Sequence, residues 1–306
     1  MAERPLLKGL LARFNPTDAI TAGYLVLTAA LVTTLSPGNP NLPRILLAHA
    51  ALLAVQLALV MPRRAALPPV LRFFRDWYPV VFCAYLYPES GLMNDVLFEP
   101  FLDSAVISLE RFVFGGMEPS NLLHPALDHR LMVEYMHFSY FLYYFYIPLV
   151  GLVLWFDRSR REDFKRYMFA VMLCFLSCYL IFMLFPVQGP LPLRDDRFHG
   201  FFVDVMDYVY RLDTPGGAFP SSHVAVVGVV VAFAFRRSPA FGFALLPFAA
   251  SLVVSTVYCM YHYAVDALAG MLYAGVVVAV SDRIFAWMSG FFGGAADETP
   301  DRLDVG

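Results

Sequence analysis

The fold is decided first by residues 164–185, which read FKRYMFAVMLCFLSCYLIFMLF. After Lys165 and Arg166 this stretch carries no charged residue. Its length matches the ~20 residues that an α-helix needs to cross the hydrocarbon core of a bilayer. The stretch therefore predicts a transmembrane helix.

Seven further apolar stretches lie on both sides of it, at residues 18–36, 43–61, 70–88, 132–156, 219–235, 239–258 and 262–284. Hydrophobic residues make up 59% of the 306 residues and charged residues only 15%, whereas soluble domains carry about 25% charged residues. The net charge of −3 leaves no basic surface for nucleic acid. The composition thus excludes a soluble enzyme and a nucleic-acid-binding protein, and it predicts an all-α, polytopic membrane helix bundle with about eight transmembrane helices.

One membrane domain is predicted over residues 18–290. Residues 1–17 form a cytoplasmic N-terminal segment, and the first apolar stretch after them lacks a clear A-x-A cleavage site, so it is read as an anchor rather than a signal peptide. The tail at 291–306 is rich in Gly, Asp and Glu and is predicted to be a disordered cytoplasmic segment.

The distribution of positive charge predicts the topology. With eight spans and both termini in the cytoplasm, 16 of the 22 Lys and Arg residues lie on the cytoplasmic side, as the positive-inside rule requires. Span 70–88 is the weakest, because Arg72, Arg75 and Asp76 stand at its start and Pro79 interrupts it. Without it the distribution becomes 10 to 12, so the rule favours eight spans. Few lysines beside many arginines are typical of a high-GC bacterium, and this predicts a bacterial inner membrane.

Two long loops, 89–131 and 186–218, then face the periplasm or exterior. Both interleave apolar and acidic residues and are predicted to form amphipathic helices at the membrane interface. The four cysteines all lie within apolar stretches and lack zinc-ligand spacing, so they are read as core residues and no metal site is predicted.

The most informative polar motif is GGAFPSSH, residues 216–223, directly before the apolar run 224–235. Proline suits the first turn of a helix, so Pro220 predicts a helix start there. Ser221, Ser222 and the free N–H groups of this helix end could then bind a phosphate. The alternative is an ordinary capped helix with His223 at the level of the lipid headgroups.

The second motif is YHYAVD, residues 261–266, at the start of the last apolar stretch. Four residues separate His262 from Asp266, so on a helix they share one face and the carboxylate can accept the imidazole N–H. Such a pair makes the other ring nitrogen more nucleophilic. A purely structural His–Asp hydrogen bond is the alternative. Because the spans that begin at His223 and His262 both enter from the non-cytoplasmic side, we expect the two motifs to meet.

Together the motifs resemble those of the type 2 phosphatidic acid phosphatase superfamily. Its second motif is P-S-G-H and its third is S-R-x5-H-x3-D. This chain has Pro220-Ser221-Ser222-His223, and then Ser255-Thr256, five residues, His262, three residues and Asp266. GAFPSSH and HYAVD are most similar to the branch of inositol phosphorylceramide synthases and related headgroup transferases. The resemblance implies a six-helix phosphatase-like core and catalytic motifs within residues 186–270.

The same resemblance implies catalytic roles for three residues. His262 would take the phosphoryl group as a phosphohistidine, Asp266 would orient it, and His223 would protonate the leaving oxygen, without metal or cofactor. The implied partners are a lipid phosphate or phospholipid donor and a lipid or polyol acceptor. Attack by water would make the chain a phosphatase, and attack by an acceptor hydroxyl would make it a transferase.

Two departures from the family pattern concern positive charge. The first motif of the phosphatases, K-x6-R-P, is absent, and Thr256 stands where the third motif has Arg. Arg194 is the best replacement for phosphate binding, although a solvated cation paired with Asp195 or Asp196 is the alternative. A site with few cations suits a singly charged phosphodiester better than a phosphomonoester, which favours headgroup transfer.

Glu134 and His137 are three residues apart near the outer end of span 132–156 and could bind the acceptor or support the site. A satisfied polar pair within the bundle is the alternative. Two non-enzymatic interpretations also stay open for the whole chain: a transporter whose His–Asp pair relays protons, and a catalytically inactive scaffold.

Overall fold

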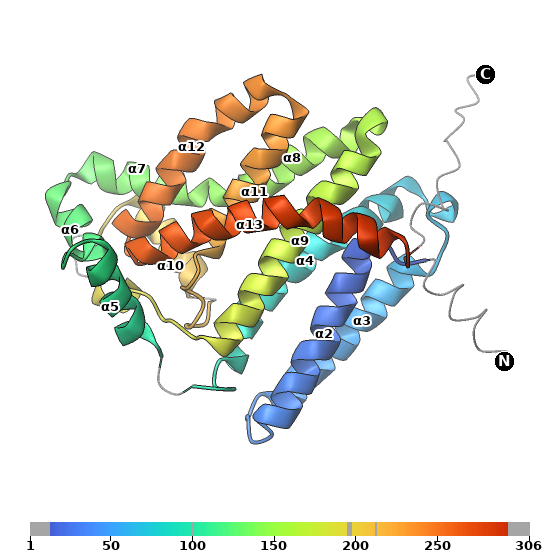
Figure 1. Cartoon of the computed structure of the whole chain (residues 1–306), viewed down its shortest axis with the longest axis horizontal. Coiled ribbons are helices and arrows are strands. Elements are labelled where there is room, and N and C mark those ends of the chain that lie inside the picture. Colours follow the sequence, from blue (N-terminus) through green and yellow to red (C-terminus); the bar gives the residue numbers. More distant parts are fainter. Residues whose placement is uncertain (1–12, 99–100, 195–197, 212, 293–306) are drawn as a thin grey trace.

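The computed structural model describes residues 13–98, 101–194, 198–211 and 213–292. This part of the chain folds into α-helices joined by short loops (Figure 1). The helices are α2 (Pro16–Leu35), α3 (Leu42–Val60), α4 (Pro69–Ser90), α5 (Asp103–Val113), α6 (Pro119–Ala126), α7 (Arg130–Phe141), α8 (Tyr143–Phe156), α9 (Arg161–Leu184), α10 (Phe201–Tyr210), α11 (Ser222–Arg237), α12 (Pro239–Tyr258) and α13 (Ala264–Ser289). The described residues contain no β-strand beyond one isolated bridge between Val187 and Gly217, so the predicted all-α class is confirmed.

The described helices include fewer candidate spans than the predicted eight. Five described helices are long and apolar enough to cross a membrane: α2, α3, α9, α12 and α13. α7 and α8 count as a sixth if the two are one span, although they meet at a bend of 40°. The described residues therefore support an integral membrane protein with five or six candidate spans, and the count of eight is not confirmed.

The predicted span 132–156 divides because its halves have different partners. α7 packs against α10 and α12, whereas α8 packs against α9 and α11. One straight helix could not reach both sets of neighbours. Leu142 ends α7, and Tyr143 begins α8.

α4 and α11 are not among the helices that are long and apolar enough to cross a membrane, for different reasons. α4 has Arg72, Arg75 and Asp76 in its first half, and Asp18 of α2 binds Arg75 at 2.6 Å. α11 has only 16 residues, about 24 Å at the usual rise, which is less than the ~30 Å hydrocarbon thickness. Its residues are nevertheless mostly buried, because α8, α9, α12 and α13 surround it.

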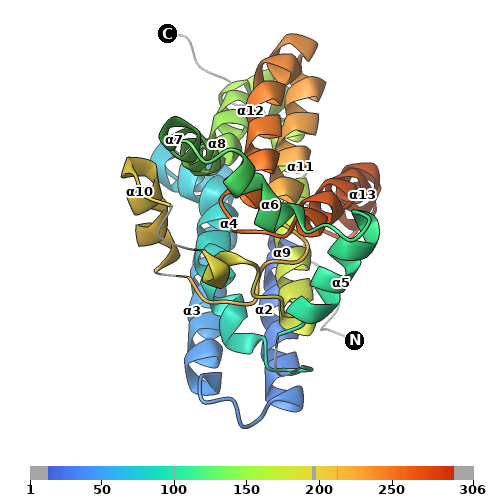
Figure 2. The same cartoon turned by 90° about the vertical axis from the view of Figure 1, so that its left-hand side faces the viewer.

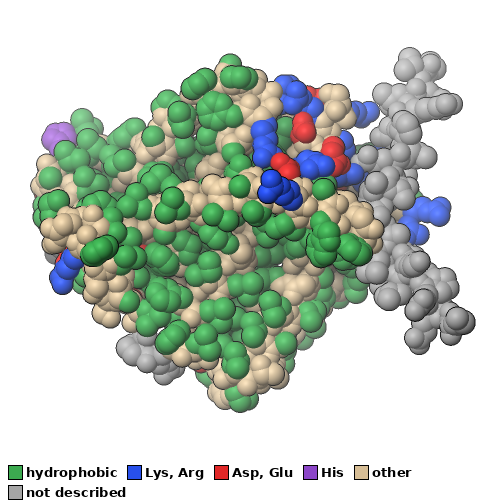
Figure 3. Space-filling model, in the orientation of Figure 1, with side chains coloured by type: hydrophobic (Ala, Val, Ile, Leu, Met, Phe, Trp, Pro, Cys, Tyr) green, Lys and Arg blue, Asp and Glu red, His purple; other side chains and the backbone are tan. Residues whose placement is uncertain are grey.

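The two ends of α11 and α13 differ in the residues that they carry. At their C-terminal ends, Asp282 binds Arg236 at 2.9 Å and Arg166 at 3.4 Å, and Figure 3 shows charged side chains gathered near these ends, beside a largely apolar surface. The two sequence motifs lie at the N-terminal ends of the same helices. The two motifs are therefore at the end of these helices opposite the arginine cluster.

Both loops predicted to carry amphipathic helices do contain helices. α5 and α6 lie in the first loop and α10 in the second, and Figure 2 shows them across the end of the molecule that faces the viewer there. α5 is tied to the site by its acids: the Asp103 carboxylate accepts the N–H groups of Gln188 and Gly189, both at 2.9 Å, and Glu110 accepts the N–H of Ala264 at 3.2 Å.

The predicted terminal segments lie largely outside the described residues. Of the N-terminal segment 1–17, the structure describes residues 13–17, where Asn15 caps α2 and accepts the N–H of Asp18 at 2.9 Å. Of the predicted tail, it describes residues 291 and 292. The cysteines Cys83, Cys174, Cys178 and Cys259 are buried and unbridged, so their prediction as core residues is confirmed.

Candidate active site

The N-termini of α11 and α13 lie against each other. The N–H of Ser221 donates to the carbonyl oxygen of Asp266 at 3.0 Å, which joins the two motifs through their backbones. Gly270, one turn further along α13, makes this approach possible, because a Cβ there would lie 2.6 Å from the carbonyl oxygen of Ser221. The structure thus brings together the two motifs that the sequence predicts to meet.

Their histidines face each other across this junction. The ring centroids of His223 and His262 are 5.7 Å apart, with the rings inclined at 61°. Both side chains are buried, with 6% and 3% of their surface exposed. A reacting phosphorus atom held between two such rings would lie within reach of both.

His262 is held differently from the prediction. It does not lie on a helix with Asp266, because α13 begins only at Ala264, and His262 is in the preceding turn, where its N–H donates to the Thr256 carbonyl at 3.0 Å. Its Nδ1 lies 2.9 Å from the carbonyl oxygen of Ala218 and 3.6 Å from Oδ2 of Asp266. The i,i+4 helical pairing is therefore wrong, although the two side chains are still neighbours.

This contact fixes the tautomer of His262. A carbonyl oxygen can only accept, so Nδ1 must carry the proton, and the lone pair of a neutral ring is then on Nε2. The described residues make no hydrogen bond to Nε2 that would occupy this lone pair. A nucleophilic imidazole requires this arrangement.

Asp266 is fully buried in the first turn of α13. Its Oδ2 accepts the N–H of Tyr263 at 2.8 Å, so the carboxylate caps the helix as well as facing His262. Its Oδ1 has no hydrogen-bond partner among the described residues. A buried carboxylate at this place is suited to stabilise positive charge on the His262 ring during phosphoryl transfer.

His223 is the second residue of α11, and aromatic rings enclose it. Its Nε2 lies 3.1 Å from the hydroxyl of Tyr140, which also hydrogen-bonds the hydroxyl of Tyr210. The ring centroid of Tyr143 is 4.3 Å from that of His223. Its Nδ1 is buried without a partner in the described part of the chain, so this nitrogen is available to a substrate oxygen.

The sequence predicts Pro220 in the first turn of α11, but in the structure Pro220 precedes the N-cap residue, which is Ser221. The reason is that the Ser221 hydroxyl accepts the N–H of Val224 at 3.4 Å and so defines the helix start one residue later. Ser222 is the first residue of the helix and is buried. Both predicted phosphate-binding serines thus lie at the helix end beside His223, with Ser221 already used as the cap.

Each of the two histidines lines a cavity, and the two cavities adjoin each other. One, of about 300 Å³, is lined mainly by apolar and aromatic side chains of α4, α8 and α9, together with Ser222 and His223. The other, of about 250 Å³, is lined by loop residues that include Gln188, Thr214 and His262. Tyr87, Tyr210 and Asp213 line both cavities and form their common wall. No Lys or Arg of the described residues lines either cavity.

Asp213 is a site residue that the sequence analysis does not single out. It lies in the loop between α10 and α11, where its Oδ1 accepts the N–H of Thr214 at 2.8 Å. Burial raises the pKa of Asp213 to about 6, against a smaller lowering by the Thr214 N–H and the Tyr87 hydroxyl. The only sequence signal for Asp213 is its position shortly before Pro215 and the GGAFPSSH motif.

Arg194 lies close to the site but does not line the cavity of His262. Its guanidinium binds Asp207 at 3.1 Å and lies 3.5 Å from the hydroxyl of Tyr261, the neighbour of His262. It also stacks over the ring of Phe198, 4.5 Å from the centroid. The alternative partners Asp195 and Asp196 lie outside the described residues.

Glu134 and His137 point to different neighbours on α7. The Glu134 carboxylate accepts the N–H groups of Phe201 and Phe202, at 2.6 and 2.9 Å, and so caps α10. His137 donates from Nδ1 to the Val133 carbonyl at 2.8 Å, and its Nε2 lies 3.5 Å from Arg194. Neither residue lines the two cavities, so any support of the site would act through α10 or Arg194.

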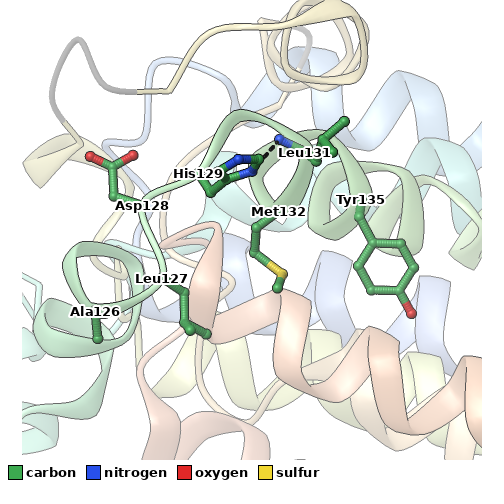
Figure 4. A pocket seen from close by; sticks show the side chains of 7 residues that line it. All are labelled: Ala126, Leu127, Asp128, His129, Leu131, Met132 and Tyr135. Atoms are coloured by element: carbon green, nitrogen blue, oxygen red, sulfur yellow. Dashed lines mark hydrogen bonds between the residues drawn. The ribbon is translucent and has the colours of Figure 1, made fainter.

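A separate pocket of about 390 Å³ lies beside α6 and α7 and is lined by residues 126–129, 131, 132 and 135 (Figure 4). In it the His129 ring accepts the N–H of Leu131 at 3.2 Å. None of the motif residues lines this pocket. It is therefore not part of the candidate site.

Comparison with known proteins agrees with this geometry. A family model described as the PAP2 superfamily matches residues 104–280, which is more than half of the chain and reaches from α5 into α13. Nothing matches the chain among curated proteins or among solved structures. Members of the superfamily are generally phosphatases or phosphotransferases, which supports an enzyme. The chain belongs to the PAP2 superfamily.

Proposed function

We propose that this protein is a membrane lipid phosphotransferase that moves a phosphate or phospho-headgroup between lipids through a phosphohistidine on His262. The observation that carries the proposal is the geometry of His262. Its Nδ1 donates to the Ala218 carbonyl, its ring lies beside that of His223 and lines the polar cavity, and no hydrogen bond of the described residues occupies its Nε2.

In the first half-reaction, Nε2 of His262 attacks phosphorus and the bond to the lipid oxygen breaks. The leaving oxygen takes a proton from His223, and Asp266 stabilises the positive charge on the His262 ring. In the second half-reaction, His223 takes the proton of the acceptor hydroxyl, whose oxygen attacks phosphorus and breaks the P–N bond. His223 therefore ends in its starting state, and no metal or cofactor is required.

The two cavities favour transfer between lipids. The leaving alcohol must lie beside His223, which lines the apolar cavity, and the phosphate must lie beside His262, which lines the polar one. A lipid alcohol could leave the apolar cavity and a second could enter it, while a polar headgroup stays on His262. This exchange is what a headgroup transferase needs.

The lack of cations in the cavity walls supports a phosphodiester donor. A diester carries one negative charge and a monoester close to two near neutral pH, so the monoester needs more compensating positive charge. Arg194 lies against Tyr261, the neighbour of His262 in the sequence, and its guanidinium could supply a single positive charge after release from Asp207. The proposed roles of Ser221, Ser222 and Arg194 are to hold this singly charged phosphate.

A lipid phosphate phosphatase with the same residues is the second candidate. The polar cavity beside His262, with Gln188 and Thr214 in its wall, has room for an attacking water. This enzyme would release inorganic phosphate from a monoester lipid, such as phosphatidic acid, without any acceptor.

One experiment separates the two. The purified protein in nanodiscs is incubated with phosphatidylinositol plus ceramide or diacylglycerol, and in parallel with phosphatidic acid alone, and the lipids are analysed by mass spectrometry. We expect a new phospho-headgroup lipid from the wild type and none from His262→Ala. Diacylglycerol and free phosphate from phosphatidic acid alone would replace the transferase by the phosphatase, and no product in either arm would contradict both.

A further inference from the structure

Asp213 occupies the wall between the two cavities, together with Tyr87 and Tyr210. A phosphate bound to His262 and a lipid oxygen beside His223 must meet at this wall, because each histidine lines a different cavity. The Tyr87 hydroxyl and the Thr214 N–H both donate to the Asp213 carboxylate and fix its position. Asp213 is therefore a rigid neighbour of the reacting phosphate.

No Lys or Arg of the described residues neutralises this carboxylate. Neither cavity is lined by Lys or Arg, and no described ion pair includes Asp213. The titratable groups that face it are Tyr87 of α4, Tyr144 of α8, Tyr210 of α10, His223 of α11 and His262. At neutral pH the tyrosines are uncharged, so the carboxylate adds one negative charge to the phosphate-binding space, and of these groups only the two histidines can carry a positive charge.

This charge affects the two kinds of phosphate unequally. A carboxylate repels a second negative charge on phosphate as strongly as the first, and the repulsion is large where little water screens it. A diester can keep its single charge compensated by the helix N-terminus and Arg194. A monoester must place its additional charge in the same space.

We propose that Asp213 is a specificity-determining residue that makes the site prefer a singly charged phosphodiester and reject a phosphomonoester dianion. The inference rests on the proposed phosphotransfer function and adds to it the residue that selects the phosphodiester. Asp213 needs no role in bond making or breaking, since its negative charge at the wall is sufficient.

The test compares kcat/KM for two donors in nanodiscs at pH 7.5: phosphatidylinositol with an acceptor lipid, and phosphatidic acid. In Asp213→Asn, which keeps the acceptor oxygen for Tyr87 but removes the charge, we expect the monoester-to-diester ratio to rise at least tenfold. Asp213→Glu restores the charge and should keep the ratio near that of the wild type. Asp204→Asn makes the same charge change at an exposed position of α10 and should leave the ratio unchanged.

An unchanged ratio in Asp213→Asn overturns the inference, and so does an equal rise in Asp213→Glu or Asp204→Asn. If Asp213→Asn does not fold, as judged by its elution from a sizing column, Asp213→Ser gives the same comparison. Failure of the proposed function looks different, because the wild type would then make no more transfer product from phosphatidylinositol and the acceptor lipid than His262→Ala does, whatever its activity on phosphatidic acid.

Discussion

Nδ1 of His262 lies 2.9 Å from the carbonyl oxygen of Ala218, closer than the 3.6 Å that separates it from Oδ2 of Asp266. The loop before α11 therefore sets the tautomer of the proposed nucleophile through its main chain. Asp266 adds a negative charge beside the same nitrogen and caps α13. This division of roles leads to separable effects of mutation.

Asp266→Asn should reduce kcat strongly with little loss of stability. The amide oxygen can take the place of Oδ2 and still accept the Tyr263 N–H, so the cap survives, but a neutral amide cannot stabilise a positively charged His262 ring. We expect a loss of kcat on the order of 100-fold or more, since the same change in a Ser-His-Asp triad costs about 10⁴. Steady-state kinetics and thermal unfolding check this. Unchanged kcat would contradict the assigned role, and Asp266→Ala should lose the cap as well and unfold at a lower temperature.

His262→Gln should abolish covalent labelling. With a donor labelled at phosphorus, the wild type should carry an acid-labile, base-stable label, which is characteristic of a phosphohistidine. His223→Gln should still be able to take the label but should turn over about 10²- to 10⁴-fold more slowly, because only proton transfer is lost. Label on His262→Gln, or a label stable to acid, would place the covalent step on another residue.

Gly270→Ala should disturb the junction of the two motifs. The added Cβ would lie 2.6 Å from the Ser221 carbonyl oxygen, so the start of α11 must move away from α13. Overpacking of this kind costs about 1–3 kcal/mol, and we expect at least a tenfold loss of kcat from the displaced His223. Gly275→Ala on the same helix is the matched control, since its Cβ would meet nothing within 4 Å. That control should be as active as the wild type, and equal effects of the two changes would disprove the junction argument.

Arg194→Gln should raise the KM for the donor about tenfold if Arg194 supplies a charge to phosphate. In the structure Asp207 holds the guanidinium, so Asp207→Asn should release it and lower the KM. Kinetics with a phosphodiester donor measure both. Loss of thermal stability in Arg194→Gln with an unchanged KM would instead assign Arg194 to anchoring Tyr261 and Phe198.

Asp213→Asn should stabilise the protein at neutral pH. Burial raises the pKa of Asp213 from 3.8 to about 6, so the folded state prefers the neutral acid and the charged form costs stability. The cost is absent below about pH 4, grows as the pH rises toward 6 and is complete above 6, where it amounts to about 3 kcal/mol. Thermal unfolding at pH 4.5 and 7.5 should show a gain for Asp213→Asn that is much larger at pH 7.5. A loss of stability at both values would show that the carboxylate is needed for folding.

The all-α membrane class follows from the amino-acid sequence alone, because long uncharged apolar stretches form helices in a bilayer. The sequence also predicts that His223 and His262 meet, since PSSH and HYAVD each precede an apolar stretch and the distribution of positive charge predicts that both lie on the same side. These features are local, since they depend on composition, on spacing and on the order of the residues along the chain.

The contacts that surround these residues follow only from the tertiary fold. Four features depend on contacts between segments far apart in the chain. They are the hydrogen bond from His262 to Ala218, the bend between α7 and α8, the burial of the short helix α11, and the position of Asp213 between the two cavities. Residues 213 and 87, for example, line the same two cavities although α4 packs mainly on α9 and α10 on α7. No spacing or periodicity encodes such a contact, because its free energy comes from side chains that become neighbours only when the bundle closes.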